Sequence, residues 1–102
     1  MPAYLIVAAA VPERKAFLDS GYPAAAATLI ERFGGRYLLR APGAELLEGE
    51  WGDGASVVIS EWPDREAARR FWDSPDYAAV KKRRDGLAQC QVLLIDAPAT
   101  GA

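Results

Sequence analysis

The chain has no histidine and only one cysteine and one methionine among its 102 residues. Without histidine it cannot build a Ser-His-Asp or Cys-His catalytic unit, and it cannot ligate haem through a proximal histidine. One cysteine allows no internal disulfide, and one thiol with carboxylates is a poor ligand set for zinc. We therefore expect no metal, no cofactor and a cytoplasmic location.

An excess of basic residues is also missing. Twelve lysines and arginines face fourteen acidic residues, which gives a net charge of −2 and argues against a nucleic-acid partner. The N-terminal apolar run, residues 4–11, is too short to span a membrane and has no basic segment before it. The sequence thus predicts a strand there, and no membrane partner.

The length predicts a single domain over residues 1–97, with a flexible tail at 98–102. Short apolar runs predict strands, and apolar stripes at helical spacing predict helices. The expected strands are 3–11, 36–41, 55–62 and 91–96, with 45–48 continuing the second, and the expected helices are 12–33, broken at 21–23, then 64–72 and 74–85.

This β-α-β-β-α-β order predicts an α+β, ferredoxin-like sandwich, a four-stranded antiparallel sheet with its helices on one face. The segments 4–7 and 57–59 do not alternate between apolar and polar residues, so the uncovered face of the sheet is apolar too. A bare apolar face on so small a protein indicates association. We expect a homodimer that packs sheet against sheet.

Several short motifs in order along the chain are similar to one known family. The motifs are GGRYLLR at 34–40, LEGEW at 47–51, EWP at 61–63, AA at 67–68 and DSPDY at 73–77. Together they span nearly the whole chain and resemble the DUF1330 family of the dimeric α+β barrel superfamily. The resemblance implies a ferredoxin-like fold and sheet-to-sheet dimers.

The resemblance implies no single activity, because the family has no general assigned function. Its superfamily resembles a collection of cofactor-free oxygenases, isomerases, lactone-handling enzymes and haem proteins, and the missing histidine excludes the haem branch here. The chain departs from the family in its first helix. A tyrosine-rich stretch is usual there, whereas this chain has Phe17, Ser20 and the break at 21–23.

Two arginines and one glutamate are the charged candidates for a site. Arg36 and Arg40 lie four apart on a strand and are expected to point to the same face, where a guanidinium could hold a carboxylate or an enolate. The alternatives are a solvated strand end for Arg36 and, for Arg40, an edge-strand charge or an ion pair with Glu48 or Glu61. Glu61 follows apolar residues and could act as a buried general base, although pairing with Arg40 is the more common arrangement.

The aromatic candidates could donate a hydrogen bond or line a pocket. Tyr77, in a first helical turn, could donate its hydroxyl to an oxyanion, or be a half-buried aromatic bound to backbone or water. Trp51, Trp62 and Trp72 with Phe71 could line a ligand pocket, although most buried tryptophans are core or interface residues.

The basic run 81–84 ends a helix, where cations interact well with the helix dipole, so a solvated capping role is expected. Cys90 is expected to pack as a small hydrophobic residue.

Two functions fit these residues. In the first, the cleft between sheet and helices carries out cofactor-free proton transfer, cyclisation, isomerisation or oxygenation on a small aromatic or polyketide-like molecule. Arg40 would stabilise negative charge, and Tyr77 or Glu61 would handle a proton. In the second, the protein is a non-catalytic ligand-binding or assembly dimer. A cavity of a few hundred Å³ that receives Arg40 and Tyr77 would favour the first.

Overall fold

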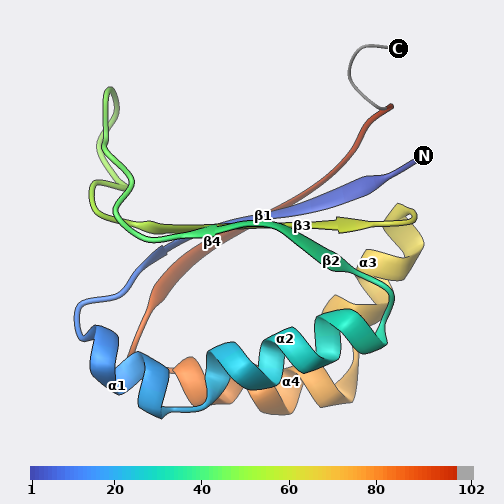
Figure 1. Ribbon diagram of the computed structural model, residues 1–102, viewed down its shortest axis with the longest axis horizontal. Helices are drawn as coiled ribbons and strands as arrows, with labels where there is room; N and C mark the ends of the chain where they lie inside the picture. The colour runs from blue at the N-terminus through green and yellow to red at the C-terminus, as the bar shows by residue number, and fades with distance from the viewer. Residues whose placement is uncertain (99–102) are drawn as a thin grey trace.

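The computed structural model describes residues 1–98, so the expected tail at 98–102 lies, apart from Pro98, outside the described residues. One four-stranded sheet carries a layer of helices on one face (Figure 1). The elements are β1 (Ala3–Ala10), α1 (Arg14–Asp19), α2 (Tyr22–Arg32), β2 (Arg36–Ala41), β3 (Ser56–Trp62), α3 (Arg65–Trp72), α4 (Pro75–Lys81), the 3₁₀ turn η1 (Lys82–Arg84) and β4 (Gln89–Asp96).

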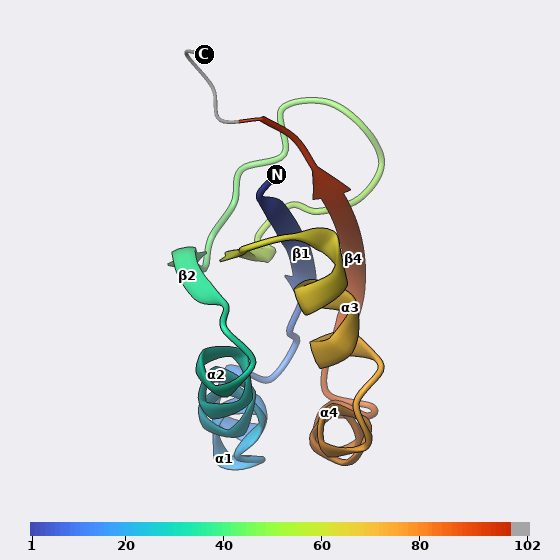
Figure 2. The ribbon, with the colours of Figure 1, turned by 90° about the vertical axis from the view of Figure 1, so that its right-hand side faces the viewer.

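The strand order is β2-β3-β1-β4, and each neighbouring pair is antiparallel. The helices lie on the same side of the sheet when the molecule is viewed along the strands (Figure 2). The predicted ferredoxin-like α+β fold is therefore confirmed.

Local signals in the sequence set the helix ends. The Asp64 side chain accepts a 2.7 Å hydrogen bond from the backbone N–H of Ala67 at the start of α3. Ser74 does the same for the backbone N–H of Tyr77 in α4, at 3.0 Å. Gly34, at φ 96°, provides the left-handed residue that ends α2. These caps stand where the sequence predicts them.

The predicted break in the first helical segment separates α1 from α2. Gly21 has a φ of 79°, which a residue with a side chain adopts only at a cost. The hydroxyl of Ser20 accepts a 3.2 Å hydrogen bond from the backbone N–H of Tyr22. The break thus makes Tyr22 the first residue of α2 and turns this helix back along the sheet.

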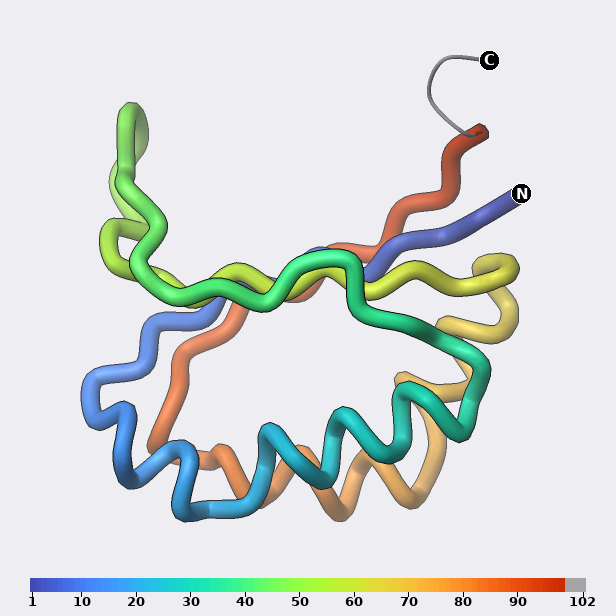
Figure 3. The backbone as a smooth tube through the Cα atoms, in the orientation of Figure 1, coloured from blue at the N-terminus to red at the C-terminus, as the bar shows by residue number. Residues whose placement is uncertain are grey.

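The connection between β2 and β3 differs from the prediction. Residues 45–48 do not continue the second strand, because the chain leaves the sheet after Ala41 and returns at Ser56. This connection rises on the side of the sheet away from the helices (Figure 3). Glycines at positive φ, such as Gly43 at 82°, produce turns that a strand cannot contain.

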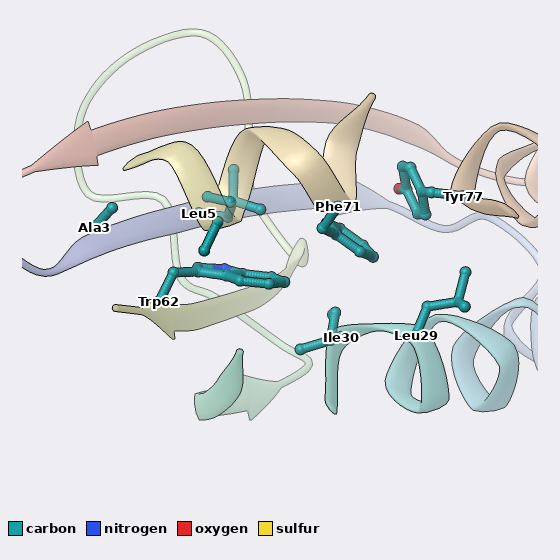
Figure 4. Packing of buried hydrophobic residues seen from close by; sticks show 9 residues of the cluster. Ala3, Leu5, Leu29, Ile30, Trp62, Phe71 and Tyr77 are labelled. Atoms are coloured by element: carbon teal, nitrogen blue, oxygen red, sulfur yellow. The ribbon is translucent and has the colours of Figure 1, made fainter. Parts of the chain in front are cut away.

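The core lies between the sheet and the helices, at the end where β3 finishes (Figure 4). Trp62 is only 1% exposed, and its ring stacks on Phe71 with the centroids 5.1 Å apart. The indole N–H donates a 2.9 Å hydrogen bond to Ser60 Oγ, which satisfies its only donor. Leu5 and Ile30 close the cluster from β1 and α2.

The opposite face of the sheet is not covered by any described segment of secondary structure (Figure 2). Its large apolar side chains include Leu93, 62% exposed, Ile95, 50% exposed, and Leu39, 42% exposed. This is the face through which the sequence predicts a dimer. Among residues 1–98, no helix has the length and apolarity needed to cross a membrane.

Candidate functional site

A cavity of about 470 Å³ lies between the sheet and the helical layer. Its sheet wall includes Val7, Val58 and Val92, and its helical wall includes Ala26 from α2 and Trp72 from α3. A cavity of this size, apolar with a few polar groups, is typical of small-molecule sites.

A β-bulge in β2 decides which of its side chains reach the cavity. The pairing with β3 shifts between Tyr37 and Leu39, so Tyr37 and Arg40 lie on the cavity face although they are three residues apart. Arg36 lies on the other face. The expectation that Arg36 and Arg40 share a face is therefore wrong, because the extra residue of a bulge reverses the alternation of side chains.

Arg36 is paired with Glu61 rather than with a ligand. Its guanidinium donates to the Glu61 carboxylate at 2.7 and 2.8 Å, and Arg36 stands directly opposite Glu61 in the β2–β3 ladder. Glu61 does not line the cavity. The expected pairing of Glu61 with Arg40 is thus wrong, and the structure does not bring the proposed base Glu61 to the cleft.

Tyr77 is held in the cavity wall by the helix start that precedes it. It is 3% exposed and packs against Phe71, with ring centroids 4.5 Å apart. Its hydroxyl lies 2.8 Å from that of Tyr22, so one of the two donates to the other. Since Tyr22 begins α2 and Tyr77 lies in the first turn of α4, the two helix starts bring together hydroxyls 55 residues apart in the sequence.

Arg84 completes this group from the turn that follows α4. Its guanidinium carbon lies 5.4 Å from the centre of the Tyr22 ring, and its Nε is buried without a hydrogen-bond partner. Burial lowers the pKa of Arg84, but the nearness of Tyr77 and Tyr22 outweighs this effect, so that its pKa is raised. Arg84 therefore stays charged inside the cavity wall.

The tyrosines are held in the neutral form. Burial, with a contribution from Tyr77, raises the pKa of Tyr22 well above its ordinary range, and the nearby Arg84 only partly opposes this. Burial also raises the pKa of Tyr37, against the lowering effect of Arg40. At neutral pH both side chains are donors of a proton in a hydrogen bond, and neither can accept a proton as a base.

The charge of the cavity wall is one-sided. Arg14, Arg40 and Arg84 line it, and no aspartate or glutamate does among the described residues. Within residues 1–98 none of the three arginines is in an ion pair. That same part of the chain contains no cluster of three side chains that could ligate a metal. Such a wall favours a ligand that carries negative charge.

The tryptophans expected to bind a ligand occupy three different environments. Trp72 lines the cavity, Trp62 is sealed in the core, and Trp51 is half-buried in the β2–β3 connection, away from the cavity. The role expected of Trp62 and Trp51 in the pocket is not supported by this placement. Like Trp72, Cys90 lines the cavity.

Three further residues of the cavity lining, Tyr22, Tyr37 and Arg84, are not among the site residues expected from the sequence. Tyr22 lies in the helix break, and Arg84 lies in a run of four basic residues for which a solvated capping role is expected. One signal points to Arg84: it lies seven residues after Tyr77, which places both on one face of a helix. Lys81, from the same run, instead covers the Trp72 ring at 4.8 Å.

Solved structures with this fold include proteins of known and unknown function. SnoaB, a cofactor-independent oxygenase from Streptomyces nogalater, is 20% identical, with a TM-score of 0.69 over 98% of this chain and 96% of its own. The RPA0582 protein of unknown function from Rhodopseudomonas palustris is also 20% identical, with a TM-score of 0.70 over 96% of this chain and 83% of its own. A dimeric protein of ferredoxin-like fold from Bacteroides fragilis is 13% identical, with a TM-score of 0.63 over 94% of this chain and 96% of its own.

Identities this low establish a shared fold and nothing more. A search among curated proteins found no match. The family described as "Domain of unknown function (DUF1330)" matches residues 2–98, which is nearly the whole chain. The chain belongs to the DUF1330 family.

Proposed function

We propose that the protein binds a small, partly aromatic molecule in the cavity between sheet and helices and stabilises a negative charge on one of its oxygens. The observation that carries this proposal is the group formed by Tyr22, Tyr77 and Arg84, in a cavity wall with three arginines and no carboxylate among the described residues. The expected site residues Arg40, Tyr77 and Trp72 all line this cavity.

The chemistry follows from what each group can do. Neutral tyrosine hydroxyls and a charged guanidinium donate hydrogen bonds, and donors fixed in a poorly solvated site stabilise an oxyanion strongly. None of the described lining residues is a carboxylate, and the chain has no histidine. The substrate must therefore be an acid already, such as a phenol or an enol, whose proton leaves to water.

A phenolate or enolate is the shared starting point of several cofactor-free reactions. It can be protonated at carbon, which isomerises the molecule, or attack an electrophilic carbon, which closes a ring. It can also give electrons to O₂, and SnoaB, which has the same fold, is described as a cofactor-independent oxygenase. We include oxygenation, isomerisation and cyclisation in the proposal.

The proposal is tested with 4-nitrophenol, whose phenol and phenolate forms absorb at different wavelengths. Bound to the protein, its pKa should fall by about 1 unit, which corresponds to about 1.4 kcal/mol of preference for the anion. Tyr22→Phe and Arg84→Gln should each remove part of that shift. Arg36→Gln, which alters an arginine on the other face of the sheet, is the matched control and should leave it intact. An unshifted pKa of the bound probe would refute the proposed function.

Binding and catalysis are separated by oxygen consumption and product analysis with phenols and enols as substrates. Turnover that Tyr22→Phe reduces would support an enzyme. Tight binding of the anion without any reaction would favour the alternative, a protein that binds a ligand without transforming it.

We also propose that the working form is a homodimer joined through the uncovered sheet face. Its support is the exposed row of Leu39, Leu93 and Ile95, and the description of the Bacteroides fragilis protein as dimeric. The cavity lies on the opposite face of the sheet, so this association leaves it open.

A further inference from the structure

The three arginines of the cavity wall come from one end of the fold. β1 and β2 finish at this end and β3 and β4 start there, because Ala9 is paired with Ser56 and Ala41 with Val57. Arg40 is next to the last residue of β2, Arg14 begins the helix after β1, and Arg84 ends the turn before β4. The positive charge of the cavity is therefore confined to one end.

The opposite end of the cavity is closed by the apolar core. The rings of Trp62, Phe71 and Tyr77 follow one another away from this end (Figure 4), and Tyr22, beyond Tyr77, lies beside Arg84. The distance between ring centroids is 5.1 Å for Trp62 and Phe71, 4.5 Å for Phe71 and Tyr77, and 6.5 Å for Tyr77 and Tyr22. A molecule bound in this cavity would contact aromatic side chains along its length and guanidinium groups at one end.

The two arginines nearest to tyrosines are held on opposite walls. Arg40 lies over the Tyr37 ring, 4.4 Å from its centre, and both belong to β2 on the sheet side. Arg84 lies beside Tyr22, and both belong to the helical layer. Arg40 is exposed and Arg84 is half-buried, so the first faces the opening and the second the interior.

In the proposed function, Tyr22, Tyr77 and Arg84 stabilise a phenolate or enolate oxygen. Arg40 has no role in that step, although the bulge in its strand brings it to the same cavity. Among the described residues it has no carboxylate partner, and Arg14 adds a second charge at the same end. A guanidinium in this setting matches a carboxylate.

We infer that Arg40, seated on Tyr37, forms a second anion subsite and that the ligand is an aromatic carboxylic acid that also carries a phenol or enol. The carboxylate binds at Arg40, at the opening, and the hydroxyl binds at Tyr22, Tyr77 and Arg84, farther in. This inference rests on the proposed function, because it assumes that the hydroxyl occupies the inner group.

The test uses three probes that share one ring system: 2-naphthol, 2-naphthoate and 6-hydroxy-2-naphthoate. Their affinities are measured by calorimetry at pH 8 for the wild type, Arg40→Gln and Tyr22→Phe. Arg36→Gln is the matched control, since it removes an arginine of the same strand that faces away from the cavity. Circular dichroism and thermal melting establish that each variant is folded.

Hydroxynaphthoate should bind tightest, because it occupies both subsites. Arg40→Gln should weaken naphthoate and hydroxynaphthoate roughly ten- to hundredfold, the range for a hydrogen bond to a charged group, and leave naphthol within about twofold. Tyr22→Phe should weaken naphthol and hydroxynaphthoate and spare naphthoate. Arg36→Gln should change none of them.

If Arg40→Gln weakened the binding of naphthol and naphthoate equally, or changed neither affinity, the second subsite would be overturned. This failure is distinct from a failure of the proposed function, which would appear as naphthol binding that Tyr22→Phe does not affect.

Discussion

Replacing Tyr22 with phenylalanine isolates one hydroxyl in the buried group. The substitution keeps the ring, whose centroid lies 5.7 Å from that of Phe17, and removes the hydroxyl oxygen that lies 2.8 Å from the hydroxyl of Tyr77. At pH 8 it should lower the free energy of unfolding by about 1 kcal/mol, the net value of one hydrogen bond. Removal of the hydroxyl also leaves the buried oxygen of Tyr77 with fewer partners.

The pH dependence gives the sharper expectation. Because the pKa of Tyr22 is raised in the native protein, the unfolded chain loses this proton first, near pH 10. Above that pH the native state binds more protons than the unfolded state, so stability falls as pH rises. Ionisation of the unfolded tyrosine alone removes about 1.4 kcal/mol of stability by pH 11. Tyr22→Phe lacks this loss.

The difference between the two unfolding free energies should therefore shrink from about 1 kcal/mol in favour of the wild type at pH 8, pass through zero, and become about 0.4 kcal/mol in favour of Tyr22→Phe at pH 11. Urea unfolding followed by tryptophan fluorescence, at one protein concentration and several pH values, measures this. A difference that stays constant from pH 8 to pH 11 would refute the argument that Tyr22 is kept neutral by the fold.

Three further predictions concern stability and assembly. Arg40→Leu should change the free energy of unfolding by less than about 1 kcal/mol, the value of an exposed cation–π contact with Tyr37, while it weakens the binding of anions; a larger loss in urea unfolding would mean that Arg40 has a structural partner. Gly35→Ala should cost about 1–3 kcal/mol, because the added methyl group would lie 2.7 Å from the Trp62 ring, and a melt that matches the wild type would show that this contact is relieved freely. Leu93→Glu, on the uncovered sheet face, should shift sedimentation toward the monomer, and an unchanged sedimentation coefficient would contradict the proposed interface.

The fold could be predicted because its signals are local. Asp64 and Ser74 cap helices where the sequence places caps, and Gly34 ends α2 in the left-handed conformation. Each of these depends on a few neighbouring residues, so the pattern of apolar and capping residues is enough to identify it.

The site could be predicted only in part, because it depends on contacts between distant segments. Arg40 and Tyr77 were expected from their positions in the motifs, and both reach the cavity. Arg36 does not share a face with Arg40, because a bulge in β2 between Tyr37 and Leu39 reverses the alternation of side chains, and no sequence pattern indicates the bulge. Glu61 lies on β3 between the buried residues Ser60 and Trp62, so the ordinary alternation of a strand places it on the face away from the cavity.

Tyr22 illustrates the same limit from another side. The sequence places it only in a helix break, whereas the role proposed for it depends on Tyr77, which lies 55 residues away. How close the starts of α2 and α4 come to each other is set by the packing of the whole protein and not by the local sequence. A helical-wheel comparison of Tyr77 with Arg84 would have raised Arg84 as a candidate, but it could not supply the second tyrosine.

A crystal structure of the protein with bound 4-nitrophenolate tests the central claim most directly. The phenolate oxygen should lie in the cavity, about 2.5–2.7 Å from a hydroxyl of Tyr22 or Tyr77, the length of a hydrogen bond from a hydroxyl to an anion. The Arg84 guanidinium should face the same oxygen. A nitrophenolate bound outside the cavity, or inside it with its oxygen turned away from both tyrosines, would contradict the claim that this group stabilises the anion of the ligand.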